Sequence, residues 1–407
     1  MESSLVELSV VMPCLNEAET LEACIVRIQQ ALLDHRITGE VIVADNGSTD
    51  GSVDIALRAG AIVVPVSAKG YGSAINGGVQ AARGTYVIMG DADSSYDFYE
   101  IPVLLAKLRE GSELVMGNRF KGGVKTGAMP FLHRYLGNPV LSYLGRLFYG
   151  IPIGDFHCGL RGFKRTAYHH WNLRTTGMEF ASEMVVKAAL SNTAIAEVPV
   201  TLSPDGRSRA PHLRTWQDGW RHLMFLLIHS PRWLFLIPGI ALFTVGLFLF
   251  LLVLPQPLEL GGFGLDIHSL LFGMTMMIAG FQATAIGVVS RIFAAKIGTK
   301  QTTRRIERLA APKTINLLIF VGALLIIVGF FGFVYSVFFW EQRSFGGLDP
   351  RKMIRLVVPF MLCFLMGFQS VVTGFFISIV NLAKTVSQSE TILIPMQQSD
   401  EETIVYS

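Results

Sequence analysis

Two acidic side chains stand directly after an apolar segment, where a strand of a sheet would end. Asp91 and Asp93 are separated by one residue and follow the apolar run 85–89. Two carboxylates at such a turn can share a hard divalent cation, because Mg²⁺ and Mn²⁺ prefer oxygen ligands and leave positions open for phosphate oxygens. Many surface loops contain the D-x-D spacing, and its place after an apolar run is what favours a metal. We therefore predict a Mg²⁺ or Mn²⁺ site formed by Asp91 and Asp93.

Other polar side chains stand at comparable places in the first half of the chain. Asp45 and Arg119 each follow an apolar run, and Lys69 lies in the glycine-containing stretch 69–74. A lysine or an arginine beyond the end of a strand can bind a phosphate. The alternatives are a tight turn at Lys69 and an ion pair between Arg119 and a surface acid. Both alternatives stay open at this point.

A loop punctuated by glycines, 154–163, carries an acid and a histidine. Asp155 has two possible roles, as a base or as a group that orients an acceptor. His157 and Cys158 are too few for a zinc site, which needs three or four ligands. We therefore interpret His157 as structural.

A basic loop precedes a segment that is rich in aromatic residues. Arg207 and Arg209 lie in this loop, just before the segment 214–230. An ordinary polar linker is the alternative, but the place before an apolar half favours an anionic lipid head group. The segment mixes tryptophan and leucine with arginine and histidine, which suits a helix in the membrane interface. A helix that packs into the core of the first domain remains the other interpretation.

Alternating strands and helices are expected to position these side chains. The apolar runs and the segments between them indicate an α/β domain with a mostly parallel, doubly wound, Rossmann-like sheet. Asn16 is predicted to cap the first helix. Ligands bind beyond the carboxyl ends of such strands, so Asp45, Asp91 and Asp93 are expected to converge on one crevice. The predicted strands are 8–12, 40–44, 61–66 and 85–89, and the predicted helices are 17–33, 51–59 and 71–82.

The composition changes sharply after residue 230. Of the 407 residues, 51% are hydrophobic and only 16% are charged, and four long runs in the second half carry no lysine, arginine or acid. Each run exceeds the roughly 20 residues that cross a hydrocarbon core, and four in succession disfavour helices buried in a soluble core. The runs are 233–254, 267–290, 314–339 and 356–383. We predict an α/β domain over 1–213, an interfacial helix over 214–230, four transmembrane helices within 231–384 and a polar tail over 385–407.

The distribution of charge predicts the side of the membrane. The loop between the second and third runs, 291–313, holds seven lysines and arginines, whereas the loop 255–266 holds none. The first residues carry no secretory signal. The positive-inside rule then places the α/β domain and the tail in the cytoplasm, at the plasma membrane if the cell is bacterial. Three bases in the loop 340–354 weaken this prediction without reversing it.

The overall charge and the cysteines exclude other classes of function. A net charge of +3 is too small to indicate a nucleic-acid partner. The four cysteines contain no CxxC pair, which disfavours a disulfide framework and a thiolate zinc site.

Taken together, the motifs resemble the family 2 glycosyltransferases, and within them the polyprenyl-phosphate hexose synthases of the dolichol-phosphate mannose and glucose synthase type. The likeness covers about residues 8–225. Asn46 replaces the second acid of the D-D-G-S-x-D motif, and Ser95 stands where the family often has a glutamine ligand. The matching stretches are 10–17 (V-V-x-P-x-x-N-E), 45–50 (D-x-G-S-x-D), 90–93 (G-D-A-D), 117–120 (G-N-R-F) and 155–163 (D-x-x-x-G-x-R-x-F).

This resemblance implies a GT-A fold and an inverting transfer of a hexose from UDP-glucose or GDP-mannose to a polyprenyl phosphate in the membrane. A phosphate monoester has a second pKa of about 6, so a strong general base is not required. A homo-oligomer stays open. The implied donor contacts are Pro13, Leu15, Glu17, Asp45, Lys69 and Asp91. The implied contacts of the lipid phosphate are Arg119, Arg207 and Arg209, and the implied catalytic residues are Asp93, Asp155 and Arg119.

Three other functions are compatible with parts of the sequence. A processive polysaccharide synthase usually carries Q-x-x-R-W, but here Trp220 precedes Arg221 after Gln217. An enzyme that glycosylates diacylglycerol or another membrane lipid would need Asp155 as a base. A transporter with a nucleotide-binding domain usually has an ionisable residue within its spans, and the four runs have no acid, lysine or arginine.

Overall fold

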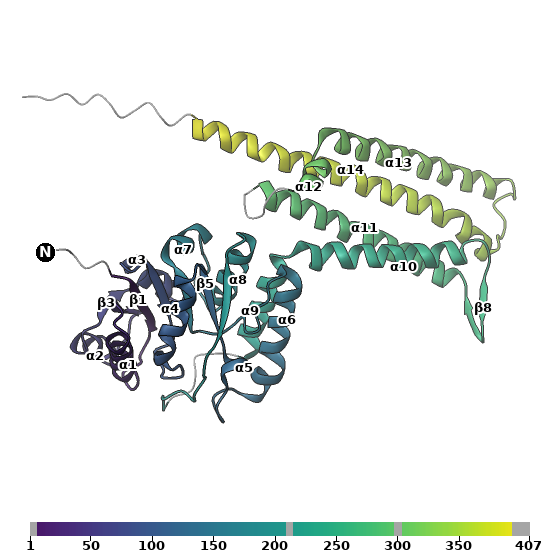
Figure 1. Cartoon of the computed structure of the whole chain (residues 1–407). Helices are drawn as coiled ribbons and strands as arrows, with labels where there is room; N and C mark the ends of the chain where they lie inside the picture. Colours follow the sequence, from purple (N-terminus) through teal and green to yellow (C-terminus); the bar gives the residue numbers. More distant parts are fainter. Residues whose placement is uncertain (1–5, 209–214, 297–302, 393–407) are drawn as a thin grey trace, which may run out of the picture. The chain divides into compact units, whose positions relative to one another are not determined.

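The computed structural model describes residues 6–208, 215–296 and 303–392 (Figure 1). The chain divides into two compact units, Met1–His229 and Ser230–Ser407. Each unit has hydrophobic clusters of its own.

The first unit is built on a mostly parallel sheet of seven strands, in the order β3-β2-β1-β4-β6-β5-β7. Its strands are β1 Leu8–Cys14, β2 Gly39–Asp45, β3 Ile62–Pro65, β4 Tyr86–Met89, β5 Leu114–Asn118, β6 Arg161–Lys164 and β7 Ile195–Pro199. All neighbouring pairs are parallel except those of β6, which runs antiparallel between β4 and β5. The predicted α/β domain with a mostly parallel sheet is confirmed.

Helices of the first unit cover both faces of this sheet. They are α1 Leu21–Asp34, α2 Ser52–Arg58, α3 Tyr71–Ala81, α4 Ile101–Arg109, α5 Arg119–Gly122, α6 Asn138–Tyr149, α7 Arg165–Trp171, α8 Phe180–Leu190 and α9 Thr215–Ile228. Val10 and Met12 of β1 belong to one core, with α1 and α4, whereas Val11 belongs to the other, with α3 and α8. Successive side chains of a strand point to opposite faces, so one apolar run serves both cores.

The first helix begins later than the sequence indicates. α1 starts at Leu21 and is preceded by Thr20, so the prediction of a helix from Glu17 with Asn16 as its cap is wrong. Asn16 has a φ of 60°, and its side-chain oxygen accepts a hydrogen bond from the Thr49 N–H at 2.7 Å. The asparagine ties the loops that follow β1 and β2 instead of capping the helix.

Four long apolar helices dominate the second unit, as the sequence predicts. Each of the four is long and apolar enough to cross a membrane. Between the first two lies a hairpin of β8 Leu258–Leu260 and β9 Phe263–Leu265, and the short α12 Arg304–Leu309 precedes the third. The long helices are α10 Ile237–Val253, α11 Ile267–Lys296, α13 Pro312–Glu341 and α14 Pro350–Ile392.

Glycines allow these helices to approach closely in pairs. A Cβ atom added to Gly246 of α10 would lie 2.7 Å from the Gly273 carbonyl oxygen of α11. One added to Gly322 of α13 would lie 2.8 Å from the Gly367 oxygen of α14. Small residues at such contacts let helix backbones pack together in a bilayer, where van der Waals contact replaces the hydrophobic effect as the driving force.

Candidate active site

The carboxyl ends of β1, β2 and β4 carry the predicted acids along one edge of the sheet. Glu17 follows β1, Asp45 ends β2, and the Asp91/Asp93 pair follows β4. β1 lies between β2 and β4, so three separate stretches of sequence meet there. Among the other predicted donor contacts, Pro13 lies in β1 and Leu15 follows it, and both are half-buried.

Asp45 and Lys69 are both tied to a turn that follows β2. The Asp45 carboxylate accepts hydrogen bonds from the backbone N–H groups of Gly47 and Ser48, at 3.0 and 3.2 Å. The ammonium of Lys69 donates to the Asn46 carbonyl oxygen at 2.7 Å. Side-chain atoms of Asn46 accept from the Gly70 N–H and donate to two carbonyls after β3. Asn46 thus holds the Lys69 loop, a role that its place in the motif did not reveal.

Asp91 and Asp93 present two carboxylates in the turn that follows β4. Burial and the negative charge of Asp93 raise the pKa of Asp91 to about 7. The Tyr71 hydroxyl donates to Asp91 Oδ1 at 3.1 Å, and Ser95 donates its N–H and its hydroxyl to Asp93 Oδ1 at 3.0 and 2.5 Å. A cation would stabilise the ionised form of this pair, so the donor set fits a divalent metal.

In the described part of the chain, no third His, Cys, Asp or Glu joins this pair as a metal ligand. Within residues 6–208, 215–296 and 303–392, no group of three or more His, Cys, Asp and Glu side chains is arranged to hold a metal ion. A magnesium ion commonly uses one or two carboxylates together with substrate phosphates. Asp91 and Asp93 therefore fit a site that a bound diphosphate completes.

Arg207 reaches back over the same carboxylates. Its guanidinium donates to Glu17 Oε1 at 3.1 Å, to Asp93 Oδ2 at 2.9 Å and to Asp205 Oδ2 at 3.0 Å. The backbone around it is fixed as well, because the Gly206 N–H donates to the Asp93 carbonyl oxygen at 2.9 Å. The geometry brings Arg207 to the predicted metal ligands, 114 residues away along the chain. Arg209, predicted to act with it, lies outside the described residues.

Arg119 and Asp155 form a buried, two-pronged ion pair. Arg119 Nε lies 2.7 Å from Asp155 Oδ2, and Nη2 lies 2.8 Å from Oδ1. Asp155 is fully buried and Arg119 is 8% exposed. The acid that pairs with Arg119 is thus a buried one from the glycine-punctuated loop. Both carboxylate oxygens are engaged, which is the arrangement of a positioning group.

Arg161 holds the loop 155–160 in place through hydrogen bonds to backbone carbonyls, a role that the sequence did not indicate. This fully buried side chain donates to the Cys158 carbonyl oxygen at 2.6 and 3.0 Å and to the Ala181 carbonyl oxygen at 2.9 Å. Gly159 donates its N–H to the Tyr96 hydroxyl at 2.8 Å. The sequence carried no local signal for this role, because the acceptors of Arg161 are backbone carbonyl oxygens.

His157 connects the same loop to α8 and α9. Its Nε2 lies 3.1 Å from the Ser182 hydroxyl, which lies 2.8 Å from Nδ1 of His222. Burial, followed by the nearby His222, lowers the pKa of His157 well below its usual value. The neutral, hydrogen-bonded ring agrees with the structural interpretation of this histidine.

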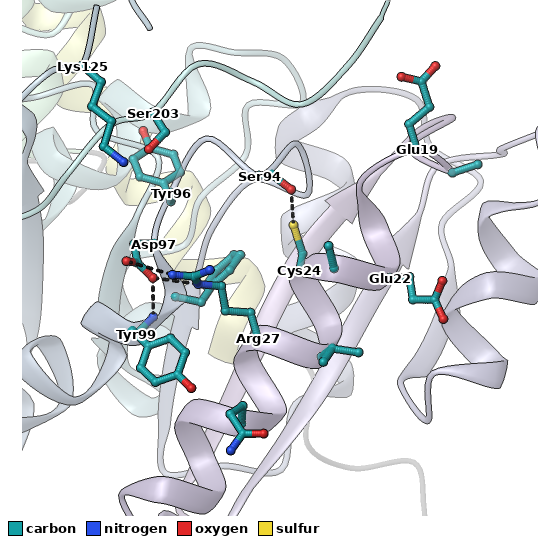
Figure 2. Close-up of a pocket in the computed structure, with 15 residues that line it drawn as sticks. Glu19, Glu22, Cys24, Arg27, Ser94, Tyr96, Asp97, Tyr99, Lys125 and Ser203 are labelled. Atoms are coloured by element: carbon teal, nitrogen blue, oxygen red, sulfur yellow. Dashed lines mark hydrogen bonds and ion pairs between the residues drawn. The ribbon is translucent and has the colours of Figure 1, made fainter.

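A hollow of about 780 Å³ lies between α1 and the segment 94–99 (Figure 2). Arg27 and Asp97 form an ion pair there, at 3.0 Å, and Cys24 Sγ lies 3.4 Å from the Ser94 hydroxyl. Asp91 and Asp93 are not among its lining residues. The two predicted metal ligands therefore do not line this hollow.

Comparison with protein families accounts for both halves of the chain. Residues 9–171 match the family described as glycosyl transferase family 2. Residues 288–381 match the glycosyltransferase family 2 C-terminal transmembrane region. The first match runs from the second residue of β1 through β6 and contains the loops after β1, β2 and β4. The second covers the end of α11, all of α13 and most of α14.

Individual relatives agree with these matches. The low-salt glycan biosynthesis hexosyltransferase Agl6 of Haloferax volcanii is 38% identical over 345 residues, which cover 84% of this chain and 82% of the relative. A dolichyl-phosphate hexose transferase of the same organism is 31% identical, covering 48% of this chain and 82% of its own. The dolichol-phosphate mannosyltransferase of Mycosarcoma maydis is also 31% identical, with coverages of 51% and 74%.

Among solved structures, glucosyl-3-phosphoglycerate synthase of Mycobacterium tuberculosis, in complex with Mn²⁺, UDP and product, is similar. The sequence identity is 25% and the TM-score 0.45, over 55% of this chain and 80% of the other. The long alignment with a hexosyltransferase and the two family matches agree with the sheet and the four apolar helices. The chain therefore belongs to glycosyltransferase family 2 and is a hexosyltransferase with a C-terminal transmembrane region.

Proposed function

We propose that this hexosyltransferase moves a hexose from UDP-glucose or GDP-mannose to a polyprenyl phosphate in the membrane. The observation that carries the proposal is the close approach of the loop 155–160 to Asp91. A Cβ atom at Gly159 would lie 2.5 Å from Asp91 Oδ2. The loop that is tied to Arg119 thus borders the two carboxylates that are suited to hold a metal ion for the diphosphate. Two relatives whose names specify dolichyl phosphate or dolichol phosphate support this class of acceptor.

The donor would lie along the ends of β1, β2 and β4. We assign its contacts to Pro13, Leu15, Glu17, Asp45, Lys69 and Asp91, and support comes from their common edge of the sheet. Lys69 is the cation that the loop after β3 brings to the turn after Asp45. This ammonium is suited to a phosphate oxygen as a point charge.

Asp91 and Asp93 would hold Mg²⁺ or Mn²⁺. The bound ion would supply charge neutralisation to the diphosphate as it leaves. Arg207, which already contacts Asp93, would add a second positive charge beside the same oxygens. Its place next to Asp93 favours a role between donor and acceptor phosphates, rather than at the lipid phosphate alone.

The acceptor phosphate would approach from the side of Arg119 and Asp155. A phosphate oxygen forms a bond to the anomeric carbon, while the bond from that carbon to the diphosphate oxygen breaks and its electron pair stays with the diphosphate. The acceptor oxygen carries no proton at neutral pH, because the second pKa of a phosphate monoester is about 6. Asp155 would fix the guanidinium of Arg119 and take no proton, so placement and charge provide the catalysis.

The membrane would keep the acceptor next to this site. We propose that residues 1–213 form the catalytic domain, that 214–230 lie in the membrane interface, that the spans within 231–384 anchor the enzyme, and that 385–407 form a tail. The basic loop 291–313 supports a cytoplasmic catalytic domain. Residues 393–407 and part of that loop lie outside the described residues.

The test is product formation by the purified full-length chain in detergent. Separate tubes would contain labelled UDP-glucose or GDP-mannose, with undecaprenyl or dolichyl phosphate and Mg²⁺ or Mn²⁺. We expect one donor to give a labelled lipid that releases a single sugar in mild acid. Label in a long polymer, or in diacylglycerol added as a competing acceptor, would contradict the proposal.

The diacylglycerol alternative makes a different demand on Asp155. A hydroxyl acceptor needs a group that removes its proton, whereas both Asp155 oxygens accept hydrogen bonds from Arg119. This engagement favours the phosphate acceptor. The Asp155→Asn variant distinguishes the two when transfer is expressed per folded molecule, since the effect on the rate is then expected to be mild with a phosphate and severe with a hydroxyl.

A further inference from the structure

The side chain of Tyr71 connects the loop that carries Lys69 to the proposed metal pair. Tyr71 is the first residue of α3 and lies in the glycine-containing stretch 69–74. Its hydroxyl donates to Asp91 Oδ1 at 3.1 Å, from a position 20 residues away along the chain. The contacts proposed for donor, metal and acceptor make no use of this hydroxyl.

The backbone on both sides of Tyr71 is packed closely at two glycines. A Cβ atom at Gly70 would collide with the Thr176 carbonyl oxygen, and one at Gly72 would lie 2.5 Å from the Thr175 carbonyl oxygen. Gly70 also has a φ of 122°, a conformation that other residues rarely adopt. The Gly72 N–H donates to the Thr176 carbonyl oxygen at 2.8 Å. The start of α3, and Tyr71 with it, is therefore fixed against a neighbouring segment.

The other end of this loop is tied to the turn after β2. The Lys69 ammonium donates to the Asn46 carbonyl oxygen at 2.7 Å, and the Gly70 N–H donates to the Asn46 side-chain oxygen at 2.8 Å. Asn46 directly follows Asp45, another proposed donor contact. The Tyr71 hydroxyl is thus mounted on a backbone that is anchored on both sides. Such a group can hold its acceptor in one orientation.

Asp91 is bordered on its other side by the loop 155–160. A Cβ atom at Gly159 would lie 2.5 Å from Asp91 Oδ2 and 3.1 Å from the Tyr96 hydroxyl. The Gly159 N–H donates to the Tyr96 hydroxyl at 2.8 Å, which holds the loop at this distance. Tyr71 therefore engages one oxygen of Asp91, and the other oxygen lies beside a residue without a side chain.

Asp93 is held in a similar way by a different hydroxyl. Ser95 donates its hydroxyl and its N–H to Asp93 Oδ1 at 2.5 and 3.0 Å. In both carboxylates of the pair, a protein hydroxyl therefore bonds Oδ1. Groups that hydrogen-bond a metal-binding carboxylate fix its orientation, and their removal typically costs about 10- to 100-fold in metal affinity or activity.

We propose that Tyr71 is a positioning residue for the divalent cation, because its hydroxyl orients the Asp91 carboxylate before Mg²⁺ or Mn²⁺ binds. The inference rests on the proposed metal pair. It adds that the affinity for the cation depends on the loop that carries Lys69, as well as on Asp91 and Asp93. Without the hydroxyl, the carboxylate could rotate, and the ion would have to order it on binding, which weakens the affinity.

The test compares two tyrosines whose hydroxyls each donate one hydrogen bond of 3.1 Å. Tyr71→Phe removes the bond to Asp91, and Tyr168→Phe, the matched control, removes a bond to Asn76 in α3. Electron paramagnetic resonance measures Mn²⁺ binding to the full-length chain in detergent, with UDP or GDP present. We expect the Kd for Mn²⁺ to rise by about 10- to 100-fold in Tyr71→Phe and to stay unchanged in Tyr168→Phe.

The dependence of the transfer rate on Mn²⁺ concentration is the second measurement. In Tyr71→Phe, the concentration that gives half the maximal rate should rise, and saturating Mn²⁺ should restore most of the rate. The KM for the polyprenyl phosphate should stay unchanged. A merely structural role of Tyr71 would lower the rate at every Mn²⁺ concentration, so a loss that Mn²⁺ does not restore would overturn the inference.

Two further outcomes would also overturn it. Equal Mn²⁺ affinity in Tyr71→Phe and the wild type would do so while leaving the proposed function intact. An equal loss of affinity in both phenylalanine variants would mean that the effect comes from packing around α3. If the wild type bound Mn²⁺ no better than Asp93→Asn, the metal pair itself would be wrong, and the role of Tyr71 would fall with it.

Discussion

The first unit buries charged side chains beside its crevice, whereas the membrane unit brings helix backbones together at glycines. Asp155 and Arg161 are fully buried, and each is held by several hydrogen bonds. In the membrane unit, a Cβ atom at Gly246 or Gly322 would collide with the facing helix. A buried charge needs polar partners that the fold holds in place. A glycine contact needs only two helix surfaces that fit closely together.

The side chains proposed for transfer and the helices proposed to anchor the chain belong to different units. The polar groups that point to transfer, Asp91, Asp93, Arg119 and Arg207, all belong to the first unit. In the described part of the membrane unit, the polar contacts of α11, α13 and α14 are largely hydroxyls bonded to their own helix, such as those of Thr284, Ser336 and Ser370. Changes at the exposed polar groups of the first unit should therefore alter catalysis, changes at its buried ion pair should also alter stability, and changes in the second unit should alter stability alone.

The largest effect is expected at Asp93. Asp93→Asn removes a charge from the proposed metal pair and from the contact with Arg207, so transfer should fall by about a thousandfold. The measurement is the initial rate of transfer together with the thermal unfolding temperature, which should change little because Asp93 lies in a partly exposed turn. Asp97→Asn, in a surface ion pair with Arg27, is the matched control and should be active. Equal activity in the two variants would contradict the metal-pair assignment.

The next effect is on stability and concerns the buried ion pair. Asp155→Ala would leave Arg119 buried without its partner, at a cost of about 3–5 kcal/mol. Chemical denaturation monitored by the first unit's tryptophans measures this change. Glu110→Ala, which breaks the exposed Lys107–Glu110 pair, should cost less than about 1 kcal/mol. Similar costs for the two substitutions would mean that the pair is not buried as described.

A smaller effect is expected in the membrane unit. Gly246→Leu would press a side chain against Gly273 and Met276 of α11, and overpacking of this kind costs about 1–3 kcal/mol. The thermal stability of the chain in detergent should fall while nucleotide binding persists. Gly264→Leu, at a glycine with nothing within 4 Å, is the control. Loss of nucleotide binding in Gly246→Leu alone would show that the two units are not separable in this way.

The smallest effect is expected at the hollow between α1 and the segment 94–99. Arg27→Gln removes a surface ion pair with Asp97, which should cost less than about 1 kcal/mol, and transfer should stay near the wild-type rate. Comparison of KM for donor and acceptor in the variant and the wild type measures this. A large rise in either KM would mean that the hollow, rather than the crevice alone, binds a substrate.

Features with a local physical cause could be predicted from the sequence. Apolar runs followed by acids correctly predicted β2 and β4. Long uncharged runs correctly predicted the four long helices. The start of α1 was misjudged, because the side chain of Asn16 bonds Thr49 in another loop. An asparagine near the start of a helix looks the same in the local sequence whether its side chain caps the helix or bonds another loop.

Pairings across the chain could not be predicted. Arg207 meets Asp93, and Arg119 meets Asp155, only because the sheet brings distant loops to one edge. The strand β6 was also missed, since its four residues, Arg161–Lys164, contain two bases and one glycine rather than an apolar run. Its Arg161 is buried because two backbone carbonyls accept its hydrogen bonds, and no local pattern reveals such acceptors.

The most direct test of the account is the anomeric configuration of the glycolipid product, determined by nuclear magnetic resonance. The donors UDP-glucose and GDP-mannose are α-linked, and the proposed single displacement by a phosphate oxygen inverts the anomeric carbon. We predict a β-linked hexosyl phosphate on the polyprenyl lipid. An α-linked product would contradict direct attack and would require a different chemistry in the crevice.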